Sequence, residues 1–305
     1  MKKFLSLFLM LTVVTIVMAT LLSCQKSDML GDADDSILSI DTTKESSKNS
    51  ETNFYNETGT NTSSTPKPEL SAEEKWNTKA SKGLAFTSNN DGTCLVSGKG
   101  SCSDFYIIIP THSSKGDLVI GIGSYAFMNC EEITSVSMPD SIKSIGSGAF
   151  SNCSRLTSVA MGNGVKEIGR NAFYECSALN SINIPNSVSN IGEYAFSGCC
   201  GLTSINIPGS VMSIGGSAFS HCSRLKSVTI SDGVKEIGVA TFDCCISLTS
   251  VTIPKSVTEI ETNAFVDCDA LDTINYTGTE MQWSSIDKRY AEIPKSVIIN
   301  YNYGK

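Results

Sequence analysis

Residues 179–199 read LNSINIPNSVSNIGEYAFSGC, and this pattern of apolar and polar residues returns every 23 residues along most of the chain. The unit reads approximately Leu-x-x-Ile-x-Ile-Pro-x-x-Val-x-x-Ile-Gly-x-x-Ala-Phe-x-x-Cys. A single unit of this length cannot enclose its own apolar side chains, whereas stacked units bury them in one continuous core. The period therefore predicts a solenoid whose core forms between successive turns.

Two columns of identical residues carry the clearest repetition. The Phe column predicts stacked core rings, and its members are Phe127, Phe150, Phe173, Phe196, Phe219, Phe242 and Phe265. The Cys column predicts a ladder of buried free thiols that act as small apolar residues, and its members are Cys130, Cys153, Cys176, Cys199, Cys222, Cys245 and Cys268. Side chains in a ladder point the same way, which is poor disulfide geometry, although some disulfide or metal content stays open as an alternative.

The segment Leu-x-x-Ile-x-Ile alternates buried and exposed positions at period two, as a half-buried strand requires. Proline, which lacks a ladder donor, follows four of these segments at Pro139, Pro185, Pro208 and Pro254. Adjacent turns are expected to pair as parallel strands about 4.8 Å apart. We predict a β-rich solenoid with about seven turns, a parallel sheet on one face and a cap at each end.

A glycine recurs in the same register and indicates a positive φ or a tight approach of two backbone segments. Its members are Gly123, Gly146, Gly169, Gly192, Gly215 and Gly238. The last unit has Glu261 at this position, which indicates that the solenoid is passing into its terminal cap.

The unit resembles the BspA-like class of leucine-rich repeats, which occurs on many bacterial surface proteins. The resemblance covers about residues 119–276 and implies a leucine-rich-repeat solenoid. Open ends of a solenoid expose core and unpaired strand edges. We therefore expect an N-terminal β cap over residues 81–118 and a C-terminal cap over residues 277–305, with Trp283 covering the final turn.

The first segment, residues 1–23, has the basic start and uncharged apolar run of a signal peptide. Residues 21–24 read LLSC and resemble the lipobox of bacterial lipoproteins, which implies that Cys24 is acylated and becomes the new N-terminus. Acyl chains would then anchor the protein to a membrane. By resemblance to Gram-negative lipoprotein sorting, Gln25 at the next position implies that the inner-membrane retention signal, an Asp there, is absent. An ordinary signal peptide or anchor helix that ends in Cys is the alternative.

Residues 24–80 are rich in Ser, Thr, Asn and Asp and poor in bulky apolar residues, so burial cannot offset the entropy of ordering them. We expect a disordered tether. Near its end, Ser71 and Glu74 fit a capping box, which predicts a short helix that docks on the domain through Trp76.

Composition argues against several classes of function. The 305 residues contain 23 Lys and Arg against 31 Asp and Glu, a net charge of −8 that speaks against a nucleic-acid partner. The two histidines, His112 and His221, lie in no nucleophile setting or zinc spacing. We therefore predict no enzyme activity, no cofactor and no metal.

Four of the 12 cysteines lie outside the lipobox and the column. Cys94 and Cys102 flank a hairpin-like stretch that is symmetric about Gly98, so a disulfide between them and two free thiols are both open. Cys200 and Cys244 lie beside members of the column, where the sequence assigns them no role.

Function is expected from the surfaces that the scaffold exposes. The strand face carries columns of small polar residues, such as Ser181 and Asn183, and lacks the large anchors typical of tight interfaces. More variable positions lie on the flank beside the Phe column. The candidate binding residues there are Tyr125, Arg155, Arg170, Tyr174, Glu193, Tyr194, His221 and Arg224.

The sequence thus predicts a lipid-anchored protein of the bacterial cell envelope, extracytoplasmic or surface-exposed, whose repeats bind a protein or glycan. The BspA-like resemblance implies adhesion to host matrix proteins or to other bacteria. A structural spacer or envelope component without a soluble ligand is the alternative, because the uniform Ser and Thr columns suit it equally well.

Overall fold

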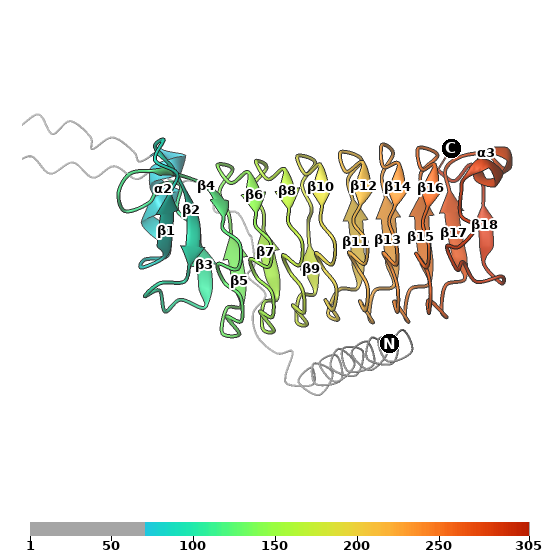
Figure 1. Cartoon of the computed structure of the whole chain (residues 1–305), viewed down its shortest axis with the longest axis horizontal. Coiled ribbons are helices and arrows are strands. Elements are labelled where there is room, and N and C mark those ends of the chain that lie inside the picture. The colour runs from blue at the N-terminus through green and yellow to red at the C-terminus, as the bar shows by residue number, and fades with distance from the viewer. Residues whose placement is uncertain (1–70, 305) are drawn as a thin grey trace, which may run out of the picture.

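Each 23-residue unit forms one turn of an elongated solenoid, and successive turns lie side by side in sequence order (Figure 1). The computed structural model describes residues 71–304. The predicted signal peptide, Cys24 and most of the predicted tether lie outside the described residues. The predicted solenoid is confirmed, but the stack amounts to about nine turns instead of seven, because the caps extend it at both ends.

The solenoid carries strands on two faces, which corrects the prediction of a single parallel sheet. One face holds a nine-stranded sheet in the order β1-β2-β4-β6-β8-β10-β12-β14-β16. Within the repeats its strands are β4 (Leu118–Ile122), β6 (Ser144–Ile145), β8 (Glu167–Ile168), β10 (Asn190–Ile191), β12 (Ser213–Ile214), β14 (Glu236–Ile237) and β16 (Glu259–Ile260). These pieces pair because the second apolar pair of each unit, Val-x-x-Ile, also buries its Ile, as Ile191 shows.

The other face holds the strands that the sequence predicted, divided into a four-stranded and a five-stranded sheet. The first comprises β3 (Tyr106–Ile108), β5 (Ser135–Ser137), β7 (Ser158–Ala160) and β9 (Ser181–Ile182). The second comprises β11 (Ser204–Ile207), β13 (Ser227–Ile230), β15 (Ser250–Ile253), β17 (Thr273–Tyr276) and β18 (Ile298–Asn300). Neighbouring turns pair in parallel with a register of 23 residues, as Val228 opposite Val251 shows.

The Phe column forms the spine of the core, as predicted. The seven rings are at most 1% exposed, and neighbouring rings stack with centroids 5.1–5.7 Å apart and interplanar angles of 3–16°. Each ring from Phe150 to Phe242 therefore buries its two faces against the rings of the turns on either side. Each turn is displaced from the preceding one by the same step, so the contact between neighbouring rings is the same along the stack.

The Cys column packs beside the rings and adds a hydrogen bond that the sequence did not predict. The thiol of Cys176 donates to the carbonyl oxygen of Phe150 in the preceding turn, 3.1 Å away. The same bond, 3.0–3.3 Å long, recurs at Cys153, Cys199, Cys222, Cys245 and Cys268. The first member, Cys130, is only half-buried. The ladder thus consists of free thiols that both pack and satisfy buried carbonyls.

Left-handed backbone occurs on both sides of every Phe of the column. The residue two positions before each Phe has a φ between 52° and 62°. The residue two positions after each Phe has a φ between 54° and 74°. The glycine column itself does not have a positive φ. It is required by a tight approach, since a Cβ on Gly146 would lie 2.6 Å from the backbone nitrogen of Ser124 in the preceding turn.

The N-terminal cap begins with α2 (Ala72–Lys79), which has the predicted capping box. The indole nitrogen of Trp76 donates to the carbonyl oxygen of Ile109 at 2.8 Å, so the predicted docking through Trp76 is confirmed. Asn77 exchanges two hydrogen bonds with Thr111. The cap therefore begins before the boundary predicted at residue 81.

Strand β1 (Ala85–Ser88) forms the hairpin of this cap, because it pairs antiparallel with β2 (Thr93–Gly98). The hairpin therefore precedes the segment predicted to be symmetric about Gly98. Cys94 and Cys102 consequently do not face each other across a hairpin, and both are free, buried thiols. The disulfide considered for this pair is not formed.

The C-terminal cap closes the other end through α3 (Glu280–Ser285) and β18. Trp283 is 7% exposed and packs edge-on against Tyr276, with ring centroids 5.2 Å apart, so its predicted covering role is confirmed. The chain after α3 also supplies backbone acceptors to the last turn. Phe265 N donates to the carbonyl oxygen of Ala291 at 3.0 Å. These bonds satisfy donors that would otherwise face a missing turn.

Replacement of Phe196 by Ala should lower the free energy of unfolding by about 3–5 kcal/mol, because it leaves a cavity between two stacked rings. Met212→Ala is the matched control, since Met212 is 64% exposed on a nearby turn. Denaturant unfolding followed by circular dichroism measures both changes. Similar stabilities for the two variants would contradict the stacked core.

Candidate functional site

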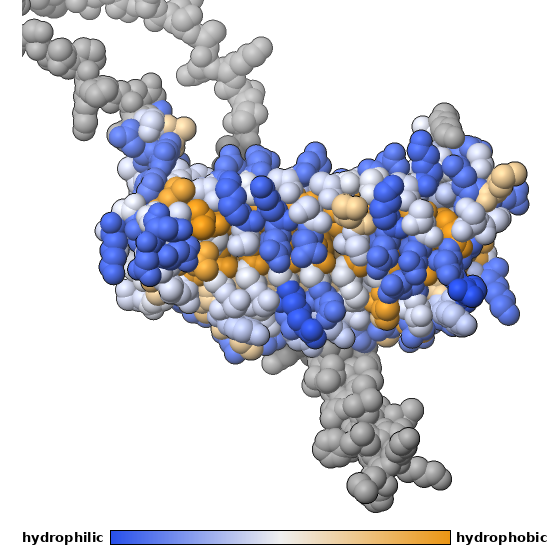
Figure 2. Space-filling model, turned by 45° about the horizontal axis from the view of Figure 1, so that its top comes forward, coloured by the Kyte–Doolittle hydropathy of each residue, from blue (hydrophilic) through white to orange (hydrophobic). Residues whose placement is uncertain are grey.

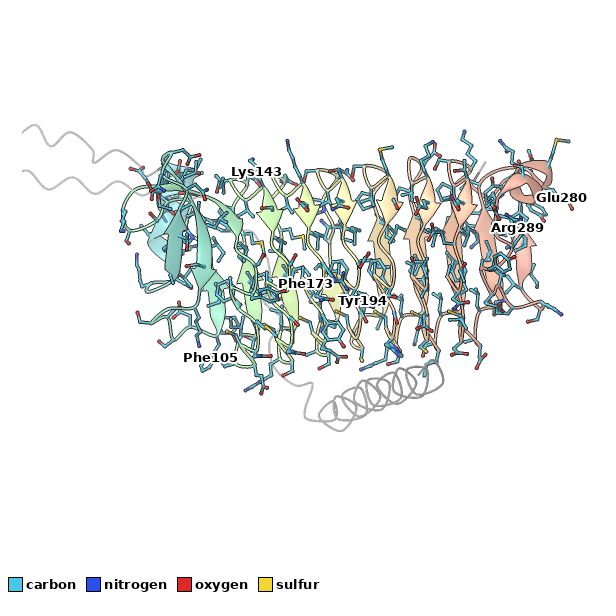
Figure 3. All side chains as sticks on the ribbon, in the orientation of Figure 1. Phe105, Lys143, Phe173, Tyr194, Glu280 and Arg289 are labelled. Atoms are coloured by element: carbon cyan, nitrogen blue, oxygen red, sulfur yellow. The ribbon has the colours of Figure 1, made fainter. Side chains whose placement is uncertain are left out.

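The predicted flank contains a cluster of side chains from two successive turns. Arg170 Nη1 lies 2.9 Å from Glu193 Oε2, and the guanidinium carbon lies 5.6 Å from the centre of the Tyr194 ring. Figure 3 shows Tyr194 midway along the solenoid. Burial raises the pKa of Tyr174, with smaller effects from Glu175 and Tyr194. The structure thus brings together four of the residues that the sequence placed on one flank: Arg170, Tyr174, Glu193 and Tyr194.

These contacts contribute little to the stability of the fold. The side chains of Arg170 and Glu193 are 59% and 55% exposed, and such ion pairs contribute about 0–1 kcal/mol. An exposed cation–π contact adds a similar amount, roughly 0.5–1 kcal/mol. The cluster is a surface feature that presents an aromatic ring and a guanidinium to solvent.

Tyr125 belongs to the same column as Tyr194, two residues before a Phe, and lies three turns earlier. Its side chain is 60% exposed and its ring lies over Gly148 in the next turn, where a Cβ would approach within 2.5 Å. Two tyrosines therefore mark the same edge about 15 Å apart, given three turns of about 4.8 Å.

The other three predicted residues lie outside this cluster, in two other columns of the repeat. Arg155 and Arg224 each follow a Phe by five residues and are exposed. His221 follows Phe219 by two residues, in the second left-handed column. The eight candidates therefore do not form one continuous site.

His221 is close to two residues of the next turn that the sequence did not connect with it. Ligand-type atoms of His221, Asp243 and Cys244 all lie within 4.8 Å of one another, and each residue is half-buried. Asp267 Oδ2 lies 3.7 Å from Cys244 Sγ. His221 lies 22 residues before the adjacent pair Asp243 and Cys244, and Asp267 lies 23 residues after that pair, so local ligand spacing could not reveal the cluster. The one available signal was the shared position of His221, Cys244 and Asp267 in the repeat.

The environment of Cys244 disfavours its thiolate. Burial is the main cause, and the carboxylates of Asp243 and Asp267 also raise the pKa of the thiol. The free protein therefore keeps Cys244 protonated at neutral pH. Cys200, the other unassigned cysteine, is buried, with its sulfur 3.3 Å from the carbonyl oxygen of Gly198.

Most of the surface that Figure 2 shows is hydrophilic, with hydrophobic residues in an interrupted band along the long axis. Among residues 71–304, no helix has the length and apolar character needed to cross a bilayer. The predicted anchor, Cys24, lies outside the described residues.

The stacked parallel turns define the class of protein as a leucine-rich-repeat solenoid. The BspA-type leucine-rich repeat region matches residues 120–208 and 189–289, with six copies of the repeat. The chain therefore belongs to the BspA-type leucine-rich repeat family. No curated protein matches it.

Three solved structures of bacterial proteins match this chain, and one of them, TpLRR, has a TM-score above 0.5. The T. pallidum protein TpLRR is 25% identical, with a TM-score of 0.59 over 71% of this chain and 97% of its own. A leucine-rich repeat protein from Bacteroides ovatus is 24% identical, with a TM-score of 0.46 over 72% of this chain and 75% of its own. The pneumococcal vaccine antigen PcpA is 20% identical, with a TM-score of 0.46 over 72% of this chain and 48% of its own.

The ladder thiols should resist alkylation in the folded protein, although they are free. Burial raises the pKa of Cys153 and Cys222 to about 12, and it excludes reagent from both. At pH 8, peptide mass spectrometry should find Cys130 modified before either residue, because Cys130 is only half-buried. In denaturant all three should react at similar rates. Equal native rates for Cys130 and Cys222 would show that the ladder is open to solvent.

Proposed function

We propose that this protein is a cell-surface lipoprotein whose leucine-rich repeats bind a protein or glycan, with the flank around Arg170 and Tyr194 as the binding surface. The observation that carries the proposal is the cluster of Arg170, Glu193 and Tyr194, which is exposed and contributes little to the fold. Family membership supports it, because solenoids of this kind are interaction modules and not typical enzyme scaffolds.

The flank suits binding better than the strand face does. Tyr and Arg are over-represented among residues that dominate interface energies, because they bury large areas and still form polar contacts. Tyr125 and Tyr194 place such residues along one edge, 60% and 38% exposed. The strand face presents small side chains such as Ser204 and Asn206, which offer little area per residue.

The anchoring half of the proposal depends on the sequence alone. The motif that ends in Cys24 resembles a lipobox, and residues 25–70 have the composition of a solvated tether. A protein held in this way would present its repeats away from the membrane, which is consistent with a role in adhesion.

The second candidate function is a spacer or envelope component that has no soluble ligand. The observation that favours it is the uniformity of the strand face, where Ser227, Ser250 and Thr273 occupy one column in consecutive turns. Such a column is well solvated, and on this face the exposed aromatic side chains Phe105 and Tyr106 lie at the N-terminal end, outside the repeats.

Binding to host matrix proteins, glycans and envelope proteins tests the two candidates. With the full chain on an array, the adhesin proposal expects saturable binding that falls at least about 10-fold in the double variant Arg170→Ala/Tyr194→Ala, as loss of two interface anchors implies. The matched control is Arg289→Ala/Tyr290→Ala, which removes an exposed ion pair and an exposed ring from the C-terminal cap, where Tyr290 is 64% exposed. Saturable binding that both double variants weaken equally would contradict the flank as the binding surface. Absence of any saturable partner would favour the spacer.

Replacement of Cys24 by Ala should abolish lipid labelling and move the protein out of the membrane fraction, because the thiol that would carry the acyl chain is lost. Metabolic labelling with a fatty-acid analogue, followed by fractionation, measures both effects. Cys130→Ala serves as the control for the loss of one cysteine. Unchanged labelling of the Cys24 variant would exclude the lipobox.

A further inference from the structure

We propose that His221, Asp243, Cys244 and Asp267 form a binding site for a divalent transition-metal ion of the zinc class. The proposal does not depend on partner binding by the flank, because none of the four residues belongs to the cluster of Arg170 and Tyr194. It replaces the expectation from the sequence that the chain has no metal site.

The geometry brings three of the side chains together from two consecutive turns, and places Asp267 of the following turn beside Cys244. Ligand-type atoms of His221, Asp243 and Cys244 lie within 4.8 Å of one another, and Asp267 Oδ2 is 3.7 Å from Cys244 Sγ. Ligand atoms around tetrahedral zinc lie about 3.5 Å apart, given bonds of about 2.0–2.3 Å. Side-chain rotations that move the ligand atoms of His221, Asp243 and Cys244 by about 1 Å would bring these three to bonding distance of one ion, and Asp267 would complete the site from beside Cys244.

The backbone that carries these ligands is held in place by the repeat. His221 N donates to the carbonyl oxygen of Asp243 at 2.8 Å, and Cys244 N donates to that of Val266 at 3.0 Å. Both His221 and Cys244 have left-handed φ, near 59° and 56°, as all residues of their column do. The left-handed φ is thus a property of the repeat, and the choice of side chains is what distinguishes this place.

Another part of the same column shows that side chains on successive turns reach one another. Asn152 Nδ2 donates to Asn129 Oδ1 at 3.0 Å, and Asn129 and Asn152 occupy the positions that His221 and Cys244 occupy four turns further on. Side chains in this column therefore come within bonding distance across the gap between turns. With His, Cys and Asp at those positions, the same spacing places metal ligands together.

The donor set selects the class of ion. One imidazole, one thiol and two carboxylates provide nitrogen, sulfur and oxygen ligands, a combination that suits Zn²⁺ and related first-row ions. Calcium and magnesium prefer all-oxygen sites, which a thiol and an imidazole do not provide. The half-buried position of the three core ligands removes part of the competition from water.

Binding of the metal ion releases one proton, which comes from the thiol of Cys244. The Cys244 S–H bond breaks, its proton goes to water, and the thiolate sulfur forms a bond to the metal while neutral His221 donates a nitrogen lone pair. The two carboxylates bind in their ionised form. No oxidant or reductant is required. The bound ion would cross-link the turns of Phe219, Phe242 and Phe265, and would stabilise the folded chain by mass action.

Metal titration of the full chain, reduced and freed of metal by a chelator, tests the site. Zinc should bind and raise the melting temperature, and Cys244→Ser and His221→Gln should each weaken the tightest site by at least about 10-fold, the lower end of what even outer-shell changes cost. Cobalt is the spectroscopic probe. It should give a thiolate-to-cobalt charge-transfer absorption that Cys244→Ser abolishes.

Matched variants separate this site from binding by other thiols or histidines. Cys130→Ser removes another half-buried cysteine, and His112→Gln removes the only other histidine; both should keep the zinc affinity, the rise in melting temperature and the cobalt absorption. Asp267→Asn should retain the absorption and weaken zinc binding. Circular dichroism establishes that each variant is folded.

The proposal is overturned by zinc binding that survives both Cys244→Ser and His221→Gln, or by a cobalt spectrum without thiolate absorption. Loss of binding in Cys244→Ser but not in His221→Gln would assign the metal to thiols alone, and would equally overturn it.

Discussion

Vertical stacking of the Phe column is the contact on which the rest of the solenoid depends. Rings 5.1–5.7 Å apart and nearly parallel can persist only if each turn is displaced from the last by one fixed step. That step also sets the thiol bond from Cys176 to the carbonyl oxygen of Phe150, and the tight approach of Gly146 to the preceding backbone. An insertion of one residue between two columns would break all three contacts together. The exact spacing of 23 residues is therefore a packing requirement.

The sequence predicted the features that depend on side-chain identity at a fixed period. The Phe and Cys columns, the strands that precede Pro208, and the closing roles of Trp76 and Trp283 all follow from apolar residues placed in register or just beyond it. The second sheet was missed because its strands from β6 to β16 are two residues long, too short for alternation to show. The left-handed columns were missed because residues such as Tyr194 occupy them, and such conformations are usually associated with Gly or Asn.

Contacts between surface side chains were harder to predict, because they join residues one full turn apart. The cluster around Arg170 was found because its residues vary where neighbouring turns do not, and because Glu193 and Tyr194 are adjacent in the chain. Arg155 and Arg224 vary in the same way, yet they lie in another column. The proximity of His221 to Cys244 was invisible to motif reasoning, since zinc motifs are recognised by ligands a few residues apart. In a solenoid, the relevant separation is one full turn.

A repeat of this kind separates structural from functional positions more strictly than an irregular fold does. Residues that face the stack must be apolar or small and similar in size in each turn, because each packs against its counterpart in the next turn. Apart from the buried Gly148 and Gly198, the residues of the two left-handed columns are exposed or half-buried, and their backbone conformation recurs on either side of each Phe. Substitution there changes the chemistry of the surface while the path of the chain stays the same, so Asn152, His221 and Cys244 can occupy equivalent places with one geometry. Function in this protein is therefore expected where a column departs from its own repeat.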